Sequence, residues 1–294
     1  MATPLPGVGS AGGPTALRML LGAHLRTLRE QGGYSRAAAG WEIRASESKI
    51  SRLELGRVSF KERDVKDLLA LYGVPNEERE RLLDLVREAN TPGWWHRFGD
   101  VLPSWFQSYL GLETTASLIR SYEVQFIPGL LQTRNYARAV IMLGHSHGSP
   151  KEIDQRVALR MSRQRTLTSD NPPWYWVVID ESALRRPIGG REVMREQLRA
   201  LIDACALPNV QLQIVPFDVG GHSGAGGAFT ILRFPDQELP DVVYIEHLTS
   251  ALYLDKRDDV DMYTECIENL CVSAEPPDRS VEILQQILKE FGDD

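Results

Sequence analysis

The chain has 294 residues, which at roughly 100–200 residues per domain predicts two domains. Hydrophobic residues make up 43% and charged residues 25%, the proportions of a soluble globular protein, and no apolar stretch reaches the ~18–20 residues that a membrane-spanning helix needs. The first fifteen residues lack the features of a signal peptide, and three cysteines without a Cys-x-x-Cys spacing fit neither a disulfide scaffold nor a zinc module. We therefore expect a cytoplasmic protein that does not associate with membranes.

The net charge of −7 is spread unevenly along the chain. Residues 16–61 carry +5, and residues 235–294 carry −12. Because salt screens charges beyond about 8–10 Å, a basic N-terminal patch can meet phosphate while the acidic end faces away. A solvated surface without any partner explains the same charges equally well.

The N-terminal part of the chain is predicted to be helical. Residues 1–15 are rich in Pro and Gly and predict a flexible tail. Apolar residues at helical spacing then predict five helices, over about 15–31, 35–43, 46–56, 65–72 and 75–89, with Ser35 and Ser46 as N-caps. Since Asn90-Thr91-Pro92-Gly93 breaks the pattern, we expect an all-α domain over 16–91 and a second domain over 92–294.

The second domain is predicted to combine helices with a sheet. Residues 94–170 read as mostly helical, with helices at about 133–143 and 151–167. Short runs of β-branched and aromatic residues then predict strands over 174–180, 210–217, 228–234 and 242–246, with 250–254 as a further candidate. Further helices are expected over about 192–206, 258–271 and 278–291. The predicted fold class is α+β, an all-α domain followed by a mixed helical and β-sheet domain.

Residues 36–55 have the pattern of a helix-turn-helix. A small residue, Gly40, stands where the second helix would cross closely over the first. Apolar residues at suitable intervals would hold the two helices together: Ala39, Ile43, Ala45, Ile50 and Leu53. Polar residues occupy the outer face of the second helix, where base edges would lie. A helix pair that only packs is the alternative interpretation.

The motifs resemble a known family. Leu25-Arg26-x-Leu28-Arg29 and Lys49-Ile50-Ser51-Arg52-Leu53-Glu54-x-Gly56 resemble the Cro/repressor-type (XRE) helix-turn-helix regulators. The remaining chain resembles the uncharacterised domain attached to such regulators in actinobacteria, on the motifs Trp94-Trp95, IPGLLQT (127–133), RMSRQ (160–164), DESAL (180–184) and VYIE (243–246). These are WhiJ-like, antitoxin-like regulators. The resemblance implies DNA-binding transcription regulation, often beside a small partner protein encoded by a neighbouring gene, and no established catalytic residues.

Position in the motif assigns candidate roles to the DNA-binding residues. By the usual docking of a helix-turn-helix, base edges are expected to be contacted by Glu47, Ser48 and Arg52. Phosphates are expected to be contacted by Arg36, Lys49, Arg57 and Lys61. The alternative for Arg52 is a salt bridge to Glu47 or to a neighbouring helix. Glu54 is expected to be structural, pairing with a basic residue at the helix exit.

Arg44 departs from the family pattern, which commonly has Gly at this position of the turn. A non-Gly residue in a left-handed conformation costs about 1 kcal/mol or more. Either the turn has another shape, or Arg44 offsets the strain by contacting a phosphate.

No complete catalytic set is found in the sequence. The Gly-rich stretch 220–227 lacks the Lys and the following helix of a phosphate-binding loop, so a mobile hairpin loop or a pocket flap is expected instead. Asp180 and Glu181 end a strand, where they could be catalytic or where Asp180 could cap the next helix. An enzyme would require Asp180, Glu181, His222 or His247 to converge in a deep pocket. We expect no enzyme activity, no cofactor and no metal.

These inferences combine into one expectation for function. A single helix-turn-helix usually binds DNA weakly, so we expect a homodimer that binds duplex DNA at a roughly palindromic site, with the second domain dimerising, sensing a ligand or binding a partner. The alternative is an antitoxin-like module that binds a small protein, with DNA binding secondary, and the acidic last 60 residues motivate it.

Overall fold

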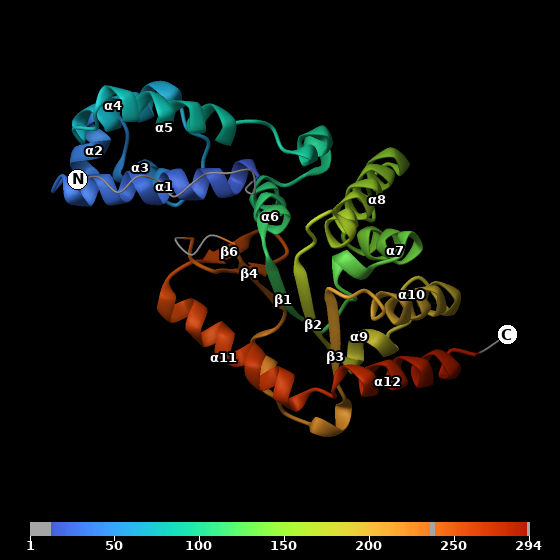
Figure 1. The fold of residues 1–294 in the computed structure, drawn as a ribbon. Helices are drawn as coiled ribbons and strands as arrows, with labels where there is room; N and C mark the ends of the chain where they lie inside the picture. The colour runs from blue at the N-terminus through green and yellow to red at the C-terminus, as the bar shows by residue number, and fades with distance from the viewer. Residues whose placement is uncertain (1–12, 236–238, 293–294) are drawn as a thin grey trace. The chain divides into compact units, whose positions relative to one another are not determined.

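The structure is a computed structural model that describes residues 13–235 and 239–292 (Figure 1). These residues form two compact units. Unit 1 consists of the described residues of 1–97, 107–115 and 236–239, and unit 2 of those of 98–106, 116–235 and 240–294. Most of the predicted N-terminal tail lies outside the described residues. Its last two residues are helical, because Pro14 starts the first helix with a preorganised φ and Thr15 is buried.

Unit 1 contains the five predicted helices. They are α1 (Pro14–Gln31), α2 (Arg36–Glu42), α3 (Glu47–Glu54), α4 (Glu62–Leu71) and α5 (Asn76–Ala89). The predicted N-caps are confirmed: Ser35 Oγ accepts a hydrogen bond from the Ala38 amide at 3.1 Å, and Ser46 Oγ accepts one from the Lys49 amide at 3.3 Å. A sixth helix, α6 (Ser104–Thr115), contributes its residues 107–115 to this unit.

Apolar side chains from all five helices form the core of unit 1. Leu21 and Leu25 of α1 pack with Ile50 of α3, Leu69 of α4 and Val86 of α5, and each is almost fully buried. Removing such side chains from water is the dominant force that holds the helices together. The core therefore fixes α3 on one side and leaves its other side for contacts outside the unit.

Unit 2 is built on a mixed six-stranded sheet in the order β3-β2-β1-β4-β5-β6 (Figure 1). The strands are β1 (Leu118–Glu123), β2 (Trp174–Asp180), β3 (Val210–Val215), β4 (Phe229–Arg233), β5 (Val242–Glu246) and β6 (Ala251–Leu254). Strands β1, β2 and β3 pair in parallel, and β4, β5 and β6 continue the sheet in antiparallel fashion. The predicted α+β fold class is confirmed.

The central strand β1 is the element that the sequence analysis missed, since residues 94–170 were predicted to be mostly helical. Its two middle side chains are polar yet buried, which hides the apolar alternation of a strand. Ser121 shares a hydrogen bond of 3.0 Å with the hydroxyl of Tyr175 on β2. The Arg120 guanidinium lies 5.2 Å from the ring centre of Trp176 and 3.7 Å from Glu268. Only these tertiary partners make the two side chains compatible with a central strand.

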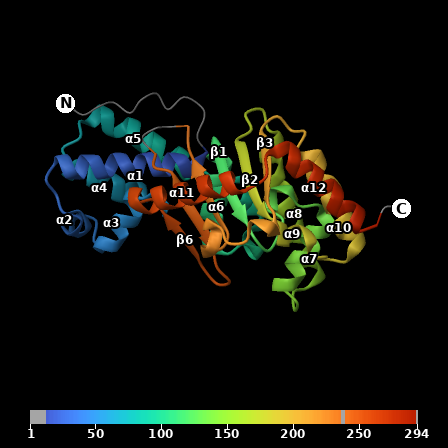
Figure 2. The ribbon, with the colours of Figure 1, turned by 90° about the horizontal axis from the view of Figure 1, so that it is seen from below.

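Helices cover both faces of this sheet. They are α7 (Arg134–Gly144), α8 (Pro150–Gln164), α9 (Glu181–Arg185), α10 (Arg191–Ala204), α11 (Arg257–Ser273) and α12 (Pro277–Glu290). On one face, Ile267 and Leu270 of α11 pack with Tyr122, Val178 and Val243 of the sheet. Figures 1 and 2 show α7, α8, α9 and α10 grouped away from α11, beside strands β1–β3.

The Gly-rich stretch 220–227 is not a hairpin loop, so this one of the two predicted alternatives is wrong. It connects β3, at the sheet edge, to β4, which pairs with β1, so the two strands that it joins are not neighbours. The stretch contains a short 3-10 turn, Ser223–Gly226, and the Ser223 hydroxyl donates a hydrogen bond of 2.9 Å to the Cys266 carbonyl on α11. Gly220 and Gly227 have φ values of 70° and 91°, which favour glycine.

Candidate nucleic-acid interface

Helices α2 and α3 cross at Gly40, as the sequence predicts. A Cβ atom at this position would lie 2.6 Å from the Ala45 carbonyl oxygen, closer than real Cβ contacts come. Ala39, Ile43, Ile50 and Leu53 belong to the core of the unit, and Ala45 packs against it. The helix pair is therefore a tightly packed helix-turn-helix.

The turn between the two helices contains a strained residue. Arg44 has a φ of +53°, the only positive φ of a non-glycine residue among those described. The turn therefore has a left-handed geometry that favours Gly, so the alternative of a differently shaped turn is wrong. An L-residue in this conformation costs about 1–2 kcal/mol. The Arg44 side chain is exposed and could contact a ligand.

Helix α3 has a buried face and an open face. Ile50 and Leu53 are each 1% exposed and lie in the core. The three predicted base-reading residues, Glu47, Ser48 and Arg52, are exposed. The Arg52 Nε atom lies 3.4 Å from the Ser48 carbonyl oxygen of its own helix. In the part of the chain that the structure describes, Arg52 forms no ion pair with Glu47 or with a neighbouring helix.

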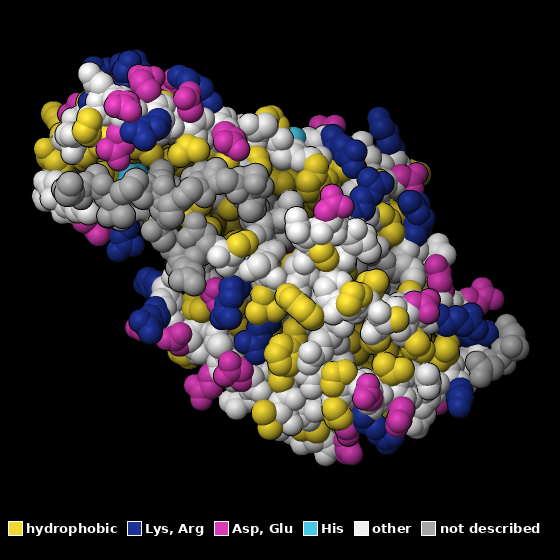
Figure 3. Space-filling view, viewed as in Figure 1, with side chains coloured by type: hydrophobic (Ala, Val, Ile, Leu, Met, Phe, Trp, Pro, Cys, Tyr) yellow, Lys and Arg dark blue, Asp and Glu magenta, His cyan; other side chains and the backbone are white. Residues whose placement is uncertain are grey.

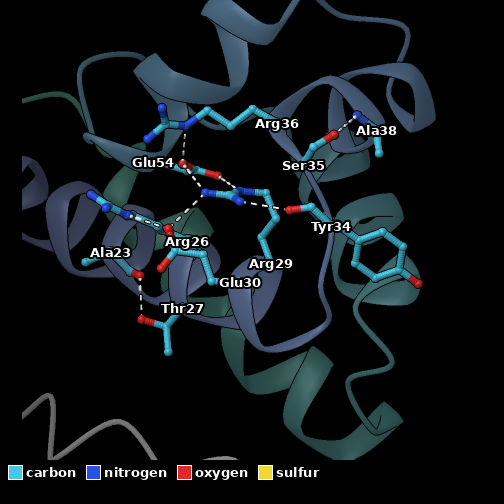
Figure 4. A network of polar contacts seen from close by, with 10 residues as sticks. All are labelled: Ala23, Arg26, Thr27, Arg29, Glu30, Tyr34, Ser35, Arg36, Ala38 and Glu54. Atoms are coloured by element: carbon cyan, nitrogen blue, oxygen red, sulfur yellow. Dashed lines mark hydrogen bonds and ion pairs between the residues drawn. The ribbon is translucent and has the colours of Figure 1, made fainter.

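A buried ion-pair network ties the helix pair to α1 (Figure 4). The Glu54 carboxylate, whose side chain is 3% exposed, accepts hydrogen bonds from Arg29 of α1, and from Arg36 Nε of α2 at 3.0 Å. Arg29 also donates a hydrogen bond of 2.9 Å to the Tyr34 carbonyl. The hydrogen bond to Glu54 raises the pKa of Arg29. The prediction that Glu54 is structural is confirmed, but its partners come from α1 and α2, not from the exit of α3.

Arg36 and Lys49, both predicted phosphate ligands, form ion pairs within unit 1. Arg36 belongs to the Glu54 network, and its side chain is 33% exposed. The Lys49 ammonium lies 2.6 Å from the Asp64 carboxylate of α4. The other two, Arg57 and Lys61, are exposed on the segment between α3 and α4. Partners that lie 15 and 18 residues away in sequence give no local signal, so the sequence could not predict these pairs.

The candidate catalytic residues of unit 2 are mostly engaged in structure. Asp180 caps α9 by accepting a hydrogen bond of 2.9 Å from the Ser182 amide, which confirms the capping alternative. The other Asp180 oxygen lies 3.4 Å from Nε2 of His222. Glu181 pairs with Arg185 at 2.5 Å and accepts a hydrogen bond from the Phe217 amide, while His247 is exposed beyond β5. Only Asp180 and His222 of the predicted set meet. Among the described residues, no cluster of three His, Cys, Asp or Glu side chains could hold a metal ion.

Two motifs of unit 2 that are distant in sequence lie side by side. Arg160 Nη1 of α8 donates a hydrogen bond of 2.8 Å to Gln132, and Gln164 donates one of 3.3 Å to the Gly129 carbonyl. Burial raises the pKa of Glu123, at the end of β1, to about 8, while nearby Arg160 opposes the shift. The IPGLLQT and RMSRQ segments thus form one polar cluster at the end of the central strand. The sequence analysis named both segments but did not predict their contact.

The crossing at Gly40 and the open polar face of α3 define a helix-turn-helix domain, a class that suggests a DNA-binding regulator. Residues 20–82 match a family model described as a helix-turn-helix domain. Residues 106–286, more than half of the chain, match one described as a domain of unknown function, DUF5753, and the chain belongs to this family. Comparisons with curated proteins and with solved structures give no match. Each described helix is too short or too polar to cross a membrane.

Proposed function

We propose that this chain is a sequence-specific transcriptional regulator of the XRE type that reads duplex DNA with α3. The observation that carries the proposal is the division of α3 into a core-packed face and an exposed polar face. A helix anchored in this way presents side chains of fixed position to the major groove, where each base pair has a distinct pattern of donors and acceptors. Glu47, Ser48 and Arg52 would read bases.

The proposed phosphate contacts come from residues in different surroundings. Arg57 and Lys61 are exposed on the segment between α3 and α4. Arg36 and Lys49 would have to share their charge between DNA and the carboxylates of Glu54 and Asp64. Arg44, exposed in the turn, would offset its backbone strain through a phosphate contact. Such contacts give affinity and salt dependence but no sequence choice.

The proposal extends to the whole chain. The motif resemblance supports a WhiJ-like, actinobacterial regulator that acts in the cytoplasm as a homodimer. The DUF5753 part would dimerise, sense a ligand or bind a partner. We propose no catalytic role for it, because Asp180 and Glu181 are used in a helix cap and an ion pair.

The Arg52→Ala variant tests the proposal. The wild-type protein is first used to select duplexes from a random library, and affinities are then measured on the selected duplex and on a scrambled duplex of equal length. If Arg52 reads a base, Arg52→Ala weakens binding to the selected duplex by about 1–3 kcal/mol, or about 5- to 150-fold. Binding to the scrambled duplex stays nearly unchanged.

A matched control comes from α5. Arg81 is also exposed and also carries one charge, but it lies outside the helix pair, and its ion pair among the described residues is with Glu77 of its own helix. Arg81→Ala should leave both affinities within about twofold, since most surface charges contribute little. Equal losses on both duplexes for Arg52→Ala would refute base reading, and a wild-type protein that ignores all duplexes at low ionic strength would refute the regulator itself.

An antitoxin-like protein-binding module is the second candidate, and the surface of α11 favours it. This helix carries five acidic residues and one basic residue, and Asp258, Asp261, Glu265 and Glu268 are exposed. Figure 3 shows acidic side chains, in magenta, at the lower left of the view, where Figure 1 places α11. Met262 and Val272 of the same helix are 70% and 86% exposed. Acidic side chains interspersed with exposed apolar ones fit a small basic partner protein.

Charge reversal on α11 tests this candidate. The partner is the small protein encoded beside this chain, captured by the immobilised full-length protein. Converting Asp261 and Glu265 to Lys should weaken an electrostatic complex at least about tenfold, because a rim of like charges slows association. The same change at Asp84 and Glu88 of α5 is the control. A complex that the α11 reversal leaves intact would contradict the electrostatic mechanism.

A further inference from the structure

Unit 2 contains a groove of about 770 Å³ beside helix α7. Residues 135, 138, 139, 142 and 143 of α7 form one wall, at the spacing that places side chains on one helix face. Residues 186–189, which connect α9 to α10, and Val193 of α10 form the opposite wall, and Gln125 and Phe126 after β1 complete the lining. Figure 1 shows α7, α9 and α10 grouped on this side of the sheet.

The walls of the groove are largely apolar and open to solvent. Met142 and Leu143 are 54% and 65% exposed. Phe126, Pro187 and Ile188 add apolar surface. A concave, mostly apolar site of about 300–1,000 Å³ with few polar groups is the usual form of a small-molecule site.

Gly189 allows the two walls of the groove to approach each other closely. The residue has a φ of +77°, and a Cβ atom there would lie 2.9 Å from the Ala139 Cβ and 3.0 Å from a methyl carbon of Val193. Any side chain at this position would be strained and would crowd the contact between α7 and α10. The hydrogen bond from the Gly190 amide to the Pro187 carbonyl, 3.1 Å, holds this turn in place.

The polar residues of the groove leave one positive charge unneutralised. Asn135 donates a hydrogen bond of 2.8 Å to Glu196, and Arg138 is paired with Asp154. Arg186 is exposed, and its side chain forms no hydrogen bond or ion pair with any residue that the structure describes. The groove therefore combines apolar walls with a single available guanidinium, a group that binds carboxylates through paired hydrogen bonds.

We propose that this groove binds a small apolar carboxylic acid. Its hydrocarbon part would lie against Met142, Leu143 and Ile188, and its carboxylate would contact Arg186. The proposal concerns ligand binding alone and stands whether or not the chain binds DNA.

Titration calorimetry with decanoate, below its critical micelle concentration, tests the proposal on the full-length protein. The expected result is saturable binding of one decanoate per chain. Decanamide, which has the same hydrocarbon chain without the charge, should bind about tenfold more weakly, because a hydrogen bond to a charged group is about twice as strong as a neutral one. Absence of saturable decanoate binding, or equal binding of both compounds, would overturn the proposal.

Three variants locate the site. Arg186→Gln should weaken decanoate binding about tenfold and leave decanamide unchanged. Met142→Asp should weaken the binding of both compounds, because it places a charge on the apolar wall. Since Met142 is exposed, the variant should fold normally, and thermal unfolding checks this. Arg134→Gln changes an exposed arginine of the same helix outside the groove and should have no effect. Full decanoate affinity in Arg186→Gln would show that the carboxylate lies elsewhere and would refute this site.

Discussion

At the scale of the residue, Arg44 combines a backbone role with a proposed DNA contact. Its φ of +53° is unfavourable for any L-residue, and glycine would adopt it without strain. Arginine at this position therefore lowers the stability of the domain, and a phosphate contact would explain why arginine stands there. Strained residues often mark functional sites.

Replacing Arg44 by Gly and by Ala separates strain from charge. Arg44→Gly should raise the free energy of unfolding by about 1 kcal/mol, because relief of the left-handed strain exceeds the extra entropy that glycine brings to the unfolded chain. Arg44→Ala keeps the strain and should leave stability nearly unchanged. Both variants should reduce the salt dependence of DNA binding by about one phosphate. Thermal unfolding and affinities over a salt series measure the two effects, and an unaltered salt slope would contradict the phosphate contact.

The sequence predicted the structural role of Glu54 but not the partners in its ion-pair network. It predicted a structural glutamate that pairs with a basic residue at the exit of its helix. Glu54 is buried, and its two arginine partners belong to α1 and α2, which only the tertiary structure brings together. A buried carboxylate of this kind fixes geometry, because leaving either partner unpaired costs about 3–5 kcal/mol.

At the scale of the element, the separation between α2 and α3 depends on Gly40. Gly40→Ala should lower the free energy of unfolding by about 1–2 kcal/mol, because the clash with the Ala45 carbonyl outweighs the better helix propensity of alanine. It should also weaken DNA binding by moving α3.

Gly144→Ala is the matched control for this prediction. Gly144 is the last residue of α7, and its added Cβ would meet no atom within 4 Å. The substitution should leave thermal unfolding unchanged or raise the midpoint slightly. If Gly40→Ala behaves in the same way, the two helices can separate without loss and the packing argument is wrong.

Elements with a strong local pattern were predicted close to their true ends, whereas β1 was missed. Strand β2 shows an apolar, β-branched run over the seven residues 174–180, and the prediction gave the same bounds. Strand β1 reads LIRSYE, and its buried Arg120 and Ser121 have no apolar signature. Hydrophobic periodicity detects buried apolar side chains. It fails for a strand such as β1, where the buried side chains are polar and are satisfied by partners distant in sequence.

At the scale of the whole molecule, the proposed function requires two copies of the helix-turn-helix. We expect sedimentation equilibrium to give twice the chain mass of 33.0 kDa. Two recognition helices would then contact half-sites about 34 Å, or about 10 base pairs, apart on one face of the DNA. Inserting five base pairs between the half-sites of a selected duplex should abolish tight binding, because it turns one half-site to the opposite face of the DNA and moves it about 17 Å away. A monomer with affinity insensitive to this spacing would contradict the dimer.

The sequence by itself determined the helix-turn-helix, its caps, its crossing glycine and most strands, because these features depend on local spacing and on which side chains avoid water. The tertiary structure decided which charges are available. It placed Arg36 and Lys49 in ion pairs, left Arg52 exposed, and put Arg186 beside an apolar groove with no ion-pair partner among the residues that the structure describes. Charge pairing depends on distances between segments far apart along the chain, and those distances exist only once the chain has folded.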